Sequence, residues 1–316
     1  MITTAVFVAL FSASALAADG TNRRNDHAAR MVVDLNFDWR FKRLDIVNDV
    51  EAAPSAYNLG PAGIEAVDYD DTAWQRVDLP HDWAIDAGYA EDNLNRDRCG
   101  YVQGGIGWYR KTIDVPDSWQ GRRVWLELDG AFRKTAVWVN GTYIGHRPYG
   151  WISFGLDISD AIAGKRKATI AVRLNNSFAS PARWYTGSGI YAPVRLVISD
   201  KLHVPFCGTL VRSEMDGDQA QVSVTTEVRN DGDNRADLTV RTTIFGPAGD
   251  KVVQADSLHT VAAGSTEVID QALAVAAPLF WSCDQPNLYT AVSELVLGGD
   301  VVDRCKTRFG VRTIEW

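Results

Sequence analysis

Short stretches of alternating apolar and polar residues recur along most of the chain. A period of two residues is typical of a strand with one buried face, whereas an amphipathic helix repeats every 3.6 residues. The stretches that read as strands are 123–128, 136–139, 168–174, 221–228, 238–245, 267–273 and 289–297. Helical periodicity of comparable strength is hard to find, so the pattern predicts an all-β chain.

Turn residues separate these stretches. Asn140-Gly141 stands between 137–139 and 142–144, and this dipeptide is the strongest short-range signal for a two-residue hairpin. Gly246-Pro247 and Gly298-Gly299 interrupt the later part of the chain. Many short strands at such spacing favour β-sandwiches over an alternating βαβ fold.

The composition changes near residue 200. Of the eleven tryptophans, only Trp281 and Trp316 follow this point. The region 34–200 is aromatic and has long irregular connections such as 84–103, whereas 201–313 has plain Val-, Thr- and Ala-rich strands. A chain of 316 residues is long enough for two domains. We therefore predict a β-sandwich at 34–200 and a second one, of immunoglobulin-like size, at 201–313.

The first residues are set apart from the fold. Residues 5–11 are apolar, and the small residues after them end in Ala15-Leu16-Ala17, an A-x-A cleavage pattern. Residues 1–4 lack the usual basic residue. No stretch reaches the ~18 apolar residues of a membrane helix. We expect 1–17 to be a signal peptide and the mature protein to be secreted or periplasmic, with no membrane partner.

The overall charge excludes one class of partner. Apolar residues make up 46% of the chain and charged residues 23%, which is ordinary for a globular protein. The formal charge is −8, and nucleic-acid phosphates require a basic face. The two short basic clusters, Arg122-Arg123 and 165–167, lie beside predicted turns and are interpreted as solvated charge. We expect no nucleic-acid partner.

The four cysteines are few and scattered, and none forms a C-x-x-C pair. A zinc site is therefore not expected, and we predict no cofactor and no metal. Cys283 and Cys305 could bridge adjacent strands if the protein is exported. The alternative is that they remain buried free thiols.

Most hydrolytic chemistries lack their residue patterns. There is no G-x-S-x-G elbow and no H-x-x-x-H pair. Paired carboxylates, which a glycosidase needs, remain open because acidic residues are plentiful between 82 and 97. The same residues are also common in turns. These acidic residues are Asp82, Asp86, Glu91, Asp92 and Asp97.

Aromatic residues stand beside polar residues and glycine turns at three places. Trp83 follows 80–82, Trp108 follows a Gly-rich turn, and Arg183-Trp184-Tyr185 precedes 186–191. A sugar ring presents an apolar face to an aromatic ring and its hydroxyls to polar side chains. We interpret these residues as exposed in loops for carbohydrate binding. The alternative is that the tryptophans close the ends of the sandwich.

Taken in order, these motifs resemble the amino-terminal half of family 2 glycoside hydrolases, the β-galactosidase, β-glucuronidase and β-mannosidase group. The matching stretches are 36–41 (NFDWRF), 71–74 with 79–83 (LPHDW), 107–111 (GWYRK), 137–141 (VWVNG), 183–191 (RWYTGSGIY), 286–289 (PNLY) and 309–312 (FGVR). They cover nearly the whole mature chain. The 79–83 and 107–111 stretches look more like those of β-galactosidases, although β-glucuronidases share much of them.

The resemblance implies a jelly-roll sugar-binding domain followed by an immunoglobulin-like domain. In the family a TIM barrel follows and carries both catalytic glutamates. We expect this barrel to be absent here, with 314–316 at its junction, so the resemblance implies no catalytic residue in this chain. It also implies that loops of the first domain reach the sugar pocket. The substrate-binding residues expected on that basis are Asp92, Asn93, Asn95, Asp97, Arg183 and Trp184.

Three hypotheses follow. The first is the non-catalytic front part of a secreted β-galactosidase-type hydrolase, which braces the barrel in cis and contacts a β-galactoside or a related carbohydrate. The second is a free-standing carbohydrate-binding module. The third is an interaction module that pairs with a separately made barrel in trans.

Overall fold

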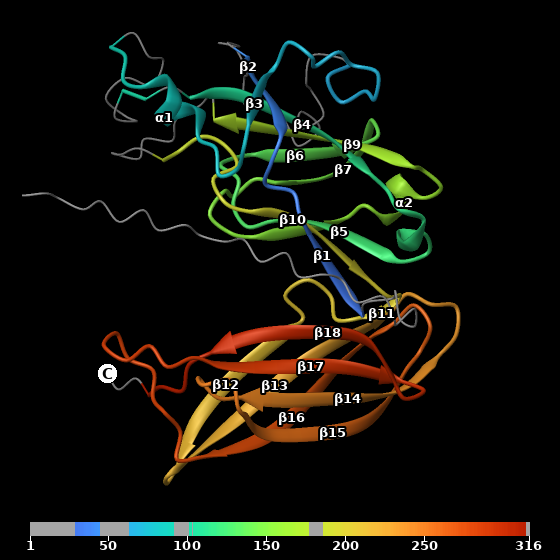
Figure 1. Cartoon of the computed structure of the whole chain (residues 1–316), viewed down its shortest axis with the longest axis vertical. Coiled ribbons are helices and arrows are strands. Elements are labelled where there is room, and N and C mark those ends of the chain that lie inside the picture. Colours follow the sequence, from blue (N-terminus) through green and yellow to red (C-terminus); the bar gives the residue numbers. More distant parts are fainter. Residues whose placement is uncertain (1–28, 45–62, 92–100, 103, 177–185, 314–316) are drawn as a thin grey trace, which may run out of the picture.

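The computed structural model describes residues 29–44, 63–91, 101–102, 104–176 and 186–313. Two β-sandwiches are stacked along the long axis, the first in the upper half of Figure 1 and the second in the lower half. This architecture confirms the all-β prediction. None of the helices in the described ranges is both long and apolar enough for a membrane crossing.

The first sandwich consists of two antiparallel sheets. The four-stranded sheet contains, in order, β1 (Arg30–Asp34), β10 (Val194–Ser199), β5 (Arg123–Leu128) and β8 (Phe154–Asp157). The six-stranded sheet contains β3 (Gln75–Val77), β2 (Trp39–Leu44), β4 (Gly105–Asp114), β9 (Lys167–Asn176), β6 (Thr135–Val139) and β7 (Thr142–Arg147). The Asn140-Gly141 hairpin joins β6 to β7, and both of its residues have the positive φ that such a turn requires.

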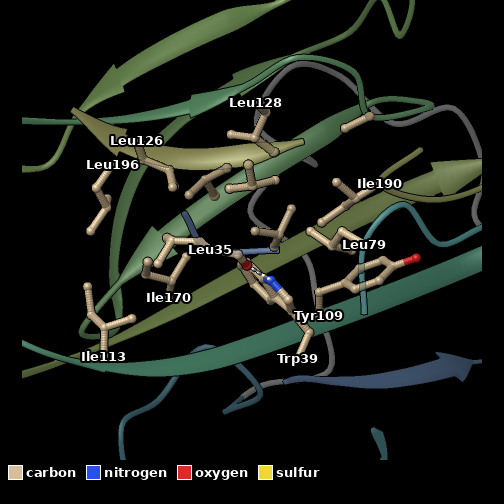
Figure 2. Close-up of a cluster of buried hydrophobic side chains, with 14 of the residues drawn as sticks. Leu35, Trp39, Leu79, Tyr109, Ile113, Leu126, Leu128, Ile170, Ile190 and Leu196 are labelled. Carbon is tan, nitrogen blue, oxygen red and sulfur yellow. Dashed lines mark hydrogen bonds between the residues drawn. The ribbon is translucent and has the colours of Figure 1, made fainter. Parts of the chain in front are cut away.

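Side chains from both sheets form the main core, part of which is drawn in Figure 2. On β5, Leu126 and Leu128 are fully buried, whereas the alternate residue Trp125 is only partly buried. Trp39 packs its ring edge-to-face against Tyr109, and its indole N–H donates to the Leu35 carbonyl. The Trp39 ring therefore lies in the apolar core while its indole N–H keeps a hydrogen-bond partner.

The outer face of the six-stranded sheet carries a second apolar cluster, which includes Trp74, Trp108 and Trp138. Trp108 is 0% exposed, so the prediction of a loop-exposed tryptophan is wrong there. Its strand is buried on both faces because the segment starting at residue 63 covers the outer one. Arg110 holds that segment by donating to Asp71 at 2.8 Å.

Helices occupy little of the described chain. α1 (Trp83–Ala87) lies within the stretch 84–103 that the sequence predicted to be irregular, and α2 (Ser159–Ile162) precedes β9. A 3₁₀ turn, η3, spans Asp117–Trp119. Asp82 is the N-cap of α1. It did not identify the helix in the sequence, because Asp is as common in turns as at helix N-caps.

The second sandwich also has two antiparallel sheets. One contains β11 (Leu202–His203), β13 (Gln219–Asn230) and β12 (Thr209–Asp216), with β16 (Thr266–Ala276) also paired to β13. The other contains β15 (Lys251–Val261), β14 (Ala236–Phe245), β17 (Tyr289–Leu297) and β18 (Asp300–Phe309). Burial alternates along β13 and along β16 from Ile269 onwards, and it places Val222, Val224 and Leu273 in the core.

The described cysteines are free thiols. Cys283 and Cys207 are exposed and Cys305 is partly buried, so the bridge between Cys283 and Cys305 that the sequence left open is not formed. The alternative of buried thiols is wrong for Cys283. Burial raises the pKa of the Cys305 thiol to about 12, which keeps this group protonated and unreactive.

Buried charges join the two sandwiches. Arg30 on β1 donates to both carboxylate oxygens of Asp303 on β18, at 2.9 and 2.7 Å, and Asp303 is 0% exposed. The same carboxylate accepts from the backbone N–H of Val204 at 2.7 Å, in the connection between the domains. A second link runs from Arg123 to Asp231 at 2.6 Å. These contacts fix the orientation of one sandwich relative to the other.

Replacing the buried carboxylate tests this link. Asp303→Ala leaves the Arg30 guanidinium and the Val204 N–H without their acceptor, so we expect a loss of about 3–5 kcal/mol in unfolding free energy. Urea denaturation measures it. Asp256→Ala is the control, because Asp256 pairs with Arg241 on the surface at 3.1 Å and should change stability by about 1 kcal/mol or less. Equal losses in the two variants would contradict the role given to Asp303.

His203, in the same connection, makes stability depend on pH. Its side chain is 1% exposed, Nδ1 lies 3.1 Å from the Lys201 carbonyl, and Nε2 has no partner in the part of the chain that the structure describes. Burial lowers its pKa. Because an unfolded histidine takes up its proton near pH 6.5 while the folded one does not, stability falls as the pH drops below about 6.5.

We expect the urea midpoint of the wild-type chain to fall between pH 7 and pH 5 more steeply than that of His203→Phe. His259→Gln serves as the control, since His259 is only partly buried and should leave the slope unchanged. Identical slopes for wild type and His203→Phe would show that His203 is not the titrating group.

Candidate functional site

A cleft of about 510 Å³ opens at the end of the first sandwich that carries α1. Three segments form it: the start of α1, the β7–β8 connection, and the segment that leads into β10. The residues lining it are Pro80, His81, Asp82, Ile85, Asp86, Trp151, Thr186, Gly187 and Tyr191. The lining therefore combines carboxylates and aromatic rings around a space of ligand size.

Backbone hydrogen bonds fix the segment that forms one wall. The N–H groups of His81 and Trp83 donate to the carbonyls of Ile190 and Ser188, at 2.9 and 3.0 Å. On the other side, Gly189 and Phe132 exchange two hydrogen bonds, at 2.9 and 3.1 Å. The chain at Gly189 thus lies between two other stretches of backbone, where a Cβ atom would sit 2.2 Å from the His81 carbonyl oxygen.

Asp82 connects this wall to α1. Its Oδ1 accepts from the N–H of Ala84, which caps the helix, and from the N–H of Ser188, both at 3.0 Å. Asn176, the last residue of β9, donates to the Gly187 carbonyl at 3.0 Å and to the Ser188 hydroxyl at 2.8 Å. Two side chains from distant parts of the sequence therefore hold the same turn.

His81 lies beneath the cleft with two different nitrogen environments. Nδ1 lies 2.6 Å from the Tyr109 hydroxyl, and Nε2 lies 3.2 Å from Oδ2 of Asp86. Burial lowers the pKa of His81, although Asp86 and Asp82 oppose this effect. Burial also raises the pKa of Tyr109 well above its usual value. Near neutral pH the pair is a neutral imidazole beside a protonated phenol.

Aromatic rings line part of the same cleft. Trp151 is 51% exposed and packs at a tilt against Tyr191 and Phe132, with ring centroids 5.6 and 4.8 Å apart. The Tyr191 hydroxyl donates to the Gly150 carbonyl at 2.7 Å. An aromatic ring that is held by its neighbours and half exposed in a cleft is suited to binding a sugar ring.

The six residues predicted to bind substrate all lie outside the described residues. They are Asp92, Asn93, Asn95, Asp97, Arg183 and Trp184. The structure describes only the ends of the two loops that contain them. At the first loop Ala90 N–H donates to the Tyr101 carbonyl at 3.0 Å, and at the second Asn176 reaches Gly187. The substrate-binding role of the six residues stays a prediction.

The aromatic prediction is wrong for Trp83, as it is for Trp108. Trp83 is 3% exposed, and its ring lies where a Cβ atom on Gly107 would be only 2.5 Å away. The alternative, that tryptophans close the end of the sandwich, describes Trp83. Its indole N–H donates to the Gly104 carbonyl at 3.2 Å.

Sequence reasoning missed Trp151 and Tyr191 as parts of one site. The available signal was weak: each stands beside or near a glycine in a connection, and 40 residues separate them. Among the described residues, no group of three or more His, Cys, Asp or Glu side chains is placed to hold a metal ion. The cleft therefore offers hydrogen bonding and stacking, the means by which polar organic ligands are bound.

Comparison with known proteins gives two consecutive family matches. The profile described as "Glycosyl hydrolases family 2, sugar binding domain" matches residues 34–199. The profile described as "Glycosyl hydrolases family 2" matches residues 207–312.

Among curated proteins, the β-galactosidase BoGH2A of Bacteroides ovatus is 34% identical over 285 residues, covering 89% of this chain and 32% of its own. A β-glucuronidase of Bacteroides fragilis is 28% identical over 251 residues, covering 75% of this chain and 35% of its own. A solved glycosyl hydrolase family 2 member from Bacteroides cellulosilyticus superposes with a TM-score of 0.80 at 30% identity, covering 90% of this chain and 36% of its own. The chain thus spans about a third of the length of these relatives.

A substitution at Gly189 tests whether the close backbone packing in this wall constrains the fold. Gly189→Ala places a methyl group against the His81 carbonyl at a φ of +146°, so we expect a loss of about 3 kcal/mol or more in unfolding free energy. Gly63→Ala is the control, because Gly63 has a φ of +103° but open space around it, and we expect a loss of about 1 kcal/mol. If urea denaturation gives the two variants equal stability, the close approach at Gly189 is not a constraint.

Proposed function

Because the chain belongs to glycosyl hydrolase family 2, we propose that it forms the non-catalytic amino-terminal part of a secreted β-galactosidase-type glycoside hydrolase. In the complete enzyme the catalytic carboxylates belong to a TIM barrel, as the resemblance implies. The two sandwiches brace that barrel, and the cleft beside α1 forms part of the rim of its sugar pocket.

One observation carries this proposal: α1, which contributes Ile85 and Asp86 to the cleft, and the carboxyl-terminal end of β18 lie on the same side of the molecule (Figure 1). Around the cleft, Ile85 is 64% and Trp151 is 51% exposed. Near the chain end, Leu279 is 55% and Phe280 is 47% exposed, and Phe280 forms a β-bridge with Val311. Exposed apolar side chains of this size favour contact with another domain.

The six loop residues belong to the same proposal. We assign Asp92, Asn93, Asn95 and Asp97 to one loop that contacts the sugar, and Arg183-Trp184 to a second. Support comes from the ends of these loops. The second loop runs directly into Thr186, which lines the cleft, and the first begins after Glu91, four residues beyond the end of α1. Loops held at rigid ends are the usual carriers of binding residues.

A second candidate is a free-standing carbohydrate-binding module. The observation that favours it is the cleft itself, which combines a half-exposed tryptophan ring with carboxylates without any contribution from a barrel. The third candidate, pairing with a separately made barrel in trans, uses the same exposed apolar side chains. Both share the fold of the leading proposal and differ from it in whether the sandwiches act alone.

Activity of the purified 316-residue chain tests the leading proposal. A retaining glycosidase needs two carboxylates about 5–5.5 Å apart across the glycosidic bond, which the proposal places on the barrel. We therefore expect nitrophenyl β-galactoside hydrolysis no faster than in buffer. A host extract carrying an empty vector, purified in parallel, controls for contaminating β-galactosidase. Turnover that copurifies with the chain and is absent from that control would contradict the non-catalytic assignment.

A further inference from the structure

The buried imidazole of His81 has one nitrogen whose hydrogen bonding is incomplete. The residue is 8% exposed and lines the cleft. Nδ1 contacts the Tyr109 hydroxyl, whereas Nε2 has no aligned hydrogen-bond partner among the described residues. Asp86 Oδ2, on a side chain that is 59% exposed, lies 3.2 Å from Nε2. Buried polar atoms in folded proteins are normally paired, and a ligand in the cleft can complete the hydrogen bonding of this nitrogen.

The surroundings of His81 favour the proton on one of its two ring nitrogens. The Tyr109 hydroxyl, which can donate, lies 2.6 Å from Nδ1. The Asp86 carboxylate, which can only accept, lies 3.2 Å from Nε2. A neutral imidazole that accepts at Nδ1 carries its proton on Nε2. His81 therefore presents an N–H donor beside the carboxylate of Asp86, which can only accept.

Because this donor and this acceptor are only 3.2 Å apart, one hydroxyl group can contact both of them at once. It can accept from Nε2–H with its oxygen and donate its proton to Asp86, whereas a carboxylate ligand could do only the first and would face repulsion. Asp82 adds a second carboxylate to the cleft, and the described lining contains no Lys or Arg. Trp151, which is 51% exposed, supplies an aromatic ring in the same cleft. The cleft therefore suits an uncharged ligand with hydroxyl groups and one apolar face, as a neutral sugar has.

We propose that His81 and Asp86 together bind one hydroxyl of a neutral saccharide whose ring lies against Trp151. This inference rests on the proposed function and adds to it a specificity-determining pair outside the two predicted sugar loops. Tyr109 is a positioning residue in this arrangement, because it acts on the sugar only through the tautomer of His81.

The test is a titration of the wild-type chain with methyl β-galactopyranoside and its four monodeoxy analogues, followed by NMR or calorimetry. We expect millimolar binding of the parent sugar and about tenfold weaker binding for Asp86→Ala and His81→Phe, as is usual when a charge-assisted hydrogen bond is lost. Asp68→Asn is the matched control, since Asp68 is an exposed carboxylate of the same domain. It should bind the sugar as the wild type does.

The deoxy analogues identify the shared hydroxyl. One analogue should bind the wild-type chain about tenfold more weakly than the parent sugar, and its affinity should not change further in Asp86→Ala or His81→Phe. The double variant should lose no more affinity than either single variant, because both residues bind the same group. Methyl β-glucuronide should bind more weakly than the galactoside. Three results would each overturn the proposal. The affinity losses of the two single variants could add up in the double variant, every deoxy analogue could bind more weakly to the variants than to the wild type, or the glucuronide could bind more tightly than the galactoside.

A wild-type chain that binds no saccharide at 50 mM, roughly the weak limit of a useful affinity, would also overturn it. That result would leave the bracing role intact, because bracing requires no sugar affinity. Conversely, hydrolysis by the chain alone would contradict the proposed function without affecting the His81–Asp86 contact. Circular dichroism and urea midpoints of each variant separate loss of binding from loss of fold.

Discussion

The close packing of backbone at Gly189 is the constraint on which the cleft end of the first sandwich depends. Three segments that are far apart in the sequence converge there: the stretch before α1, the turn at Phe132, and the segment leading into β10. Only a residue without a side chain fits between the His81 carbonyl and the Tyr109 hydroxyl. Because these segments also supply the cleft's carboxylates, imidazole and Tyr191, one packing requirement places the whole wall.

The buried pair of Arg30 and Asp303 has a comparable role at the other end of the first sandwich. A linker alone would allow the domains to rotate, but a desolvated ion pair that also takes the Val204 N–H permits one arrangement. As a result, α1 and the end of β18 stay on one side of the molecule (Figure 1). The proposed bracing of a barrel requires this fixed geometry, since a flexible pair of domains could not present one continuous surface.

The fold could be predicted from sequence to a large extent, because strands with one buried face leave a period of two in the residues. The segment 289–297 coincides with β17, and the Asn140-Gly141 hairpin follows from a positive-φ requirement that few residues meet. Where a strand is buried on both faces, as β4 is at Trp108, the alternation is lost and the aromatic residues were mistaken for exposed ones. α1 was missed because five residues are too few to show a helical period.

The candidate site was much harder to predict. The tripeptide His81-Asp82-Trp83 was noticed, but its role depends on partners such as Ser188, 106 positions away in sequence. The spacing of residues along the sequence does not predict a contact between positions so far apart. Similarly, Trp151 and Tyr191 become one wall only after the β7–β8 connection has folded against β10. Local chemistry could therefore be read from the sequence, whereas the meeting of distant residues required the structure.

Asn176 holds together the two ends of the connection between β9 and β10, since its side chain reaches across to Gly187 and Ser188. The sandwich itself therefore fixes both ends of this connection. Loop-closure entropy grows only slowly with length, so segments of different size and composition can be exchanged at this point without rebuilding the domain. A single amide side chain in this way allows this connection to vary in length and composition while the two sheets around it stay the same.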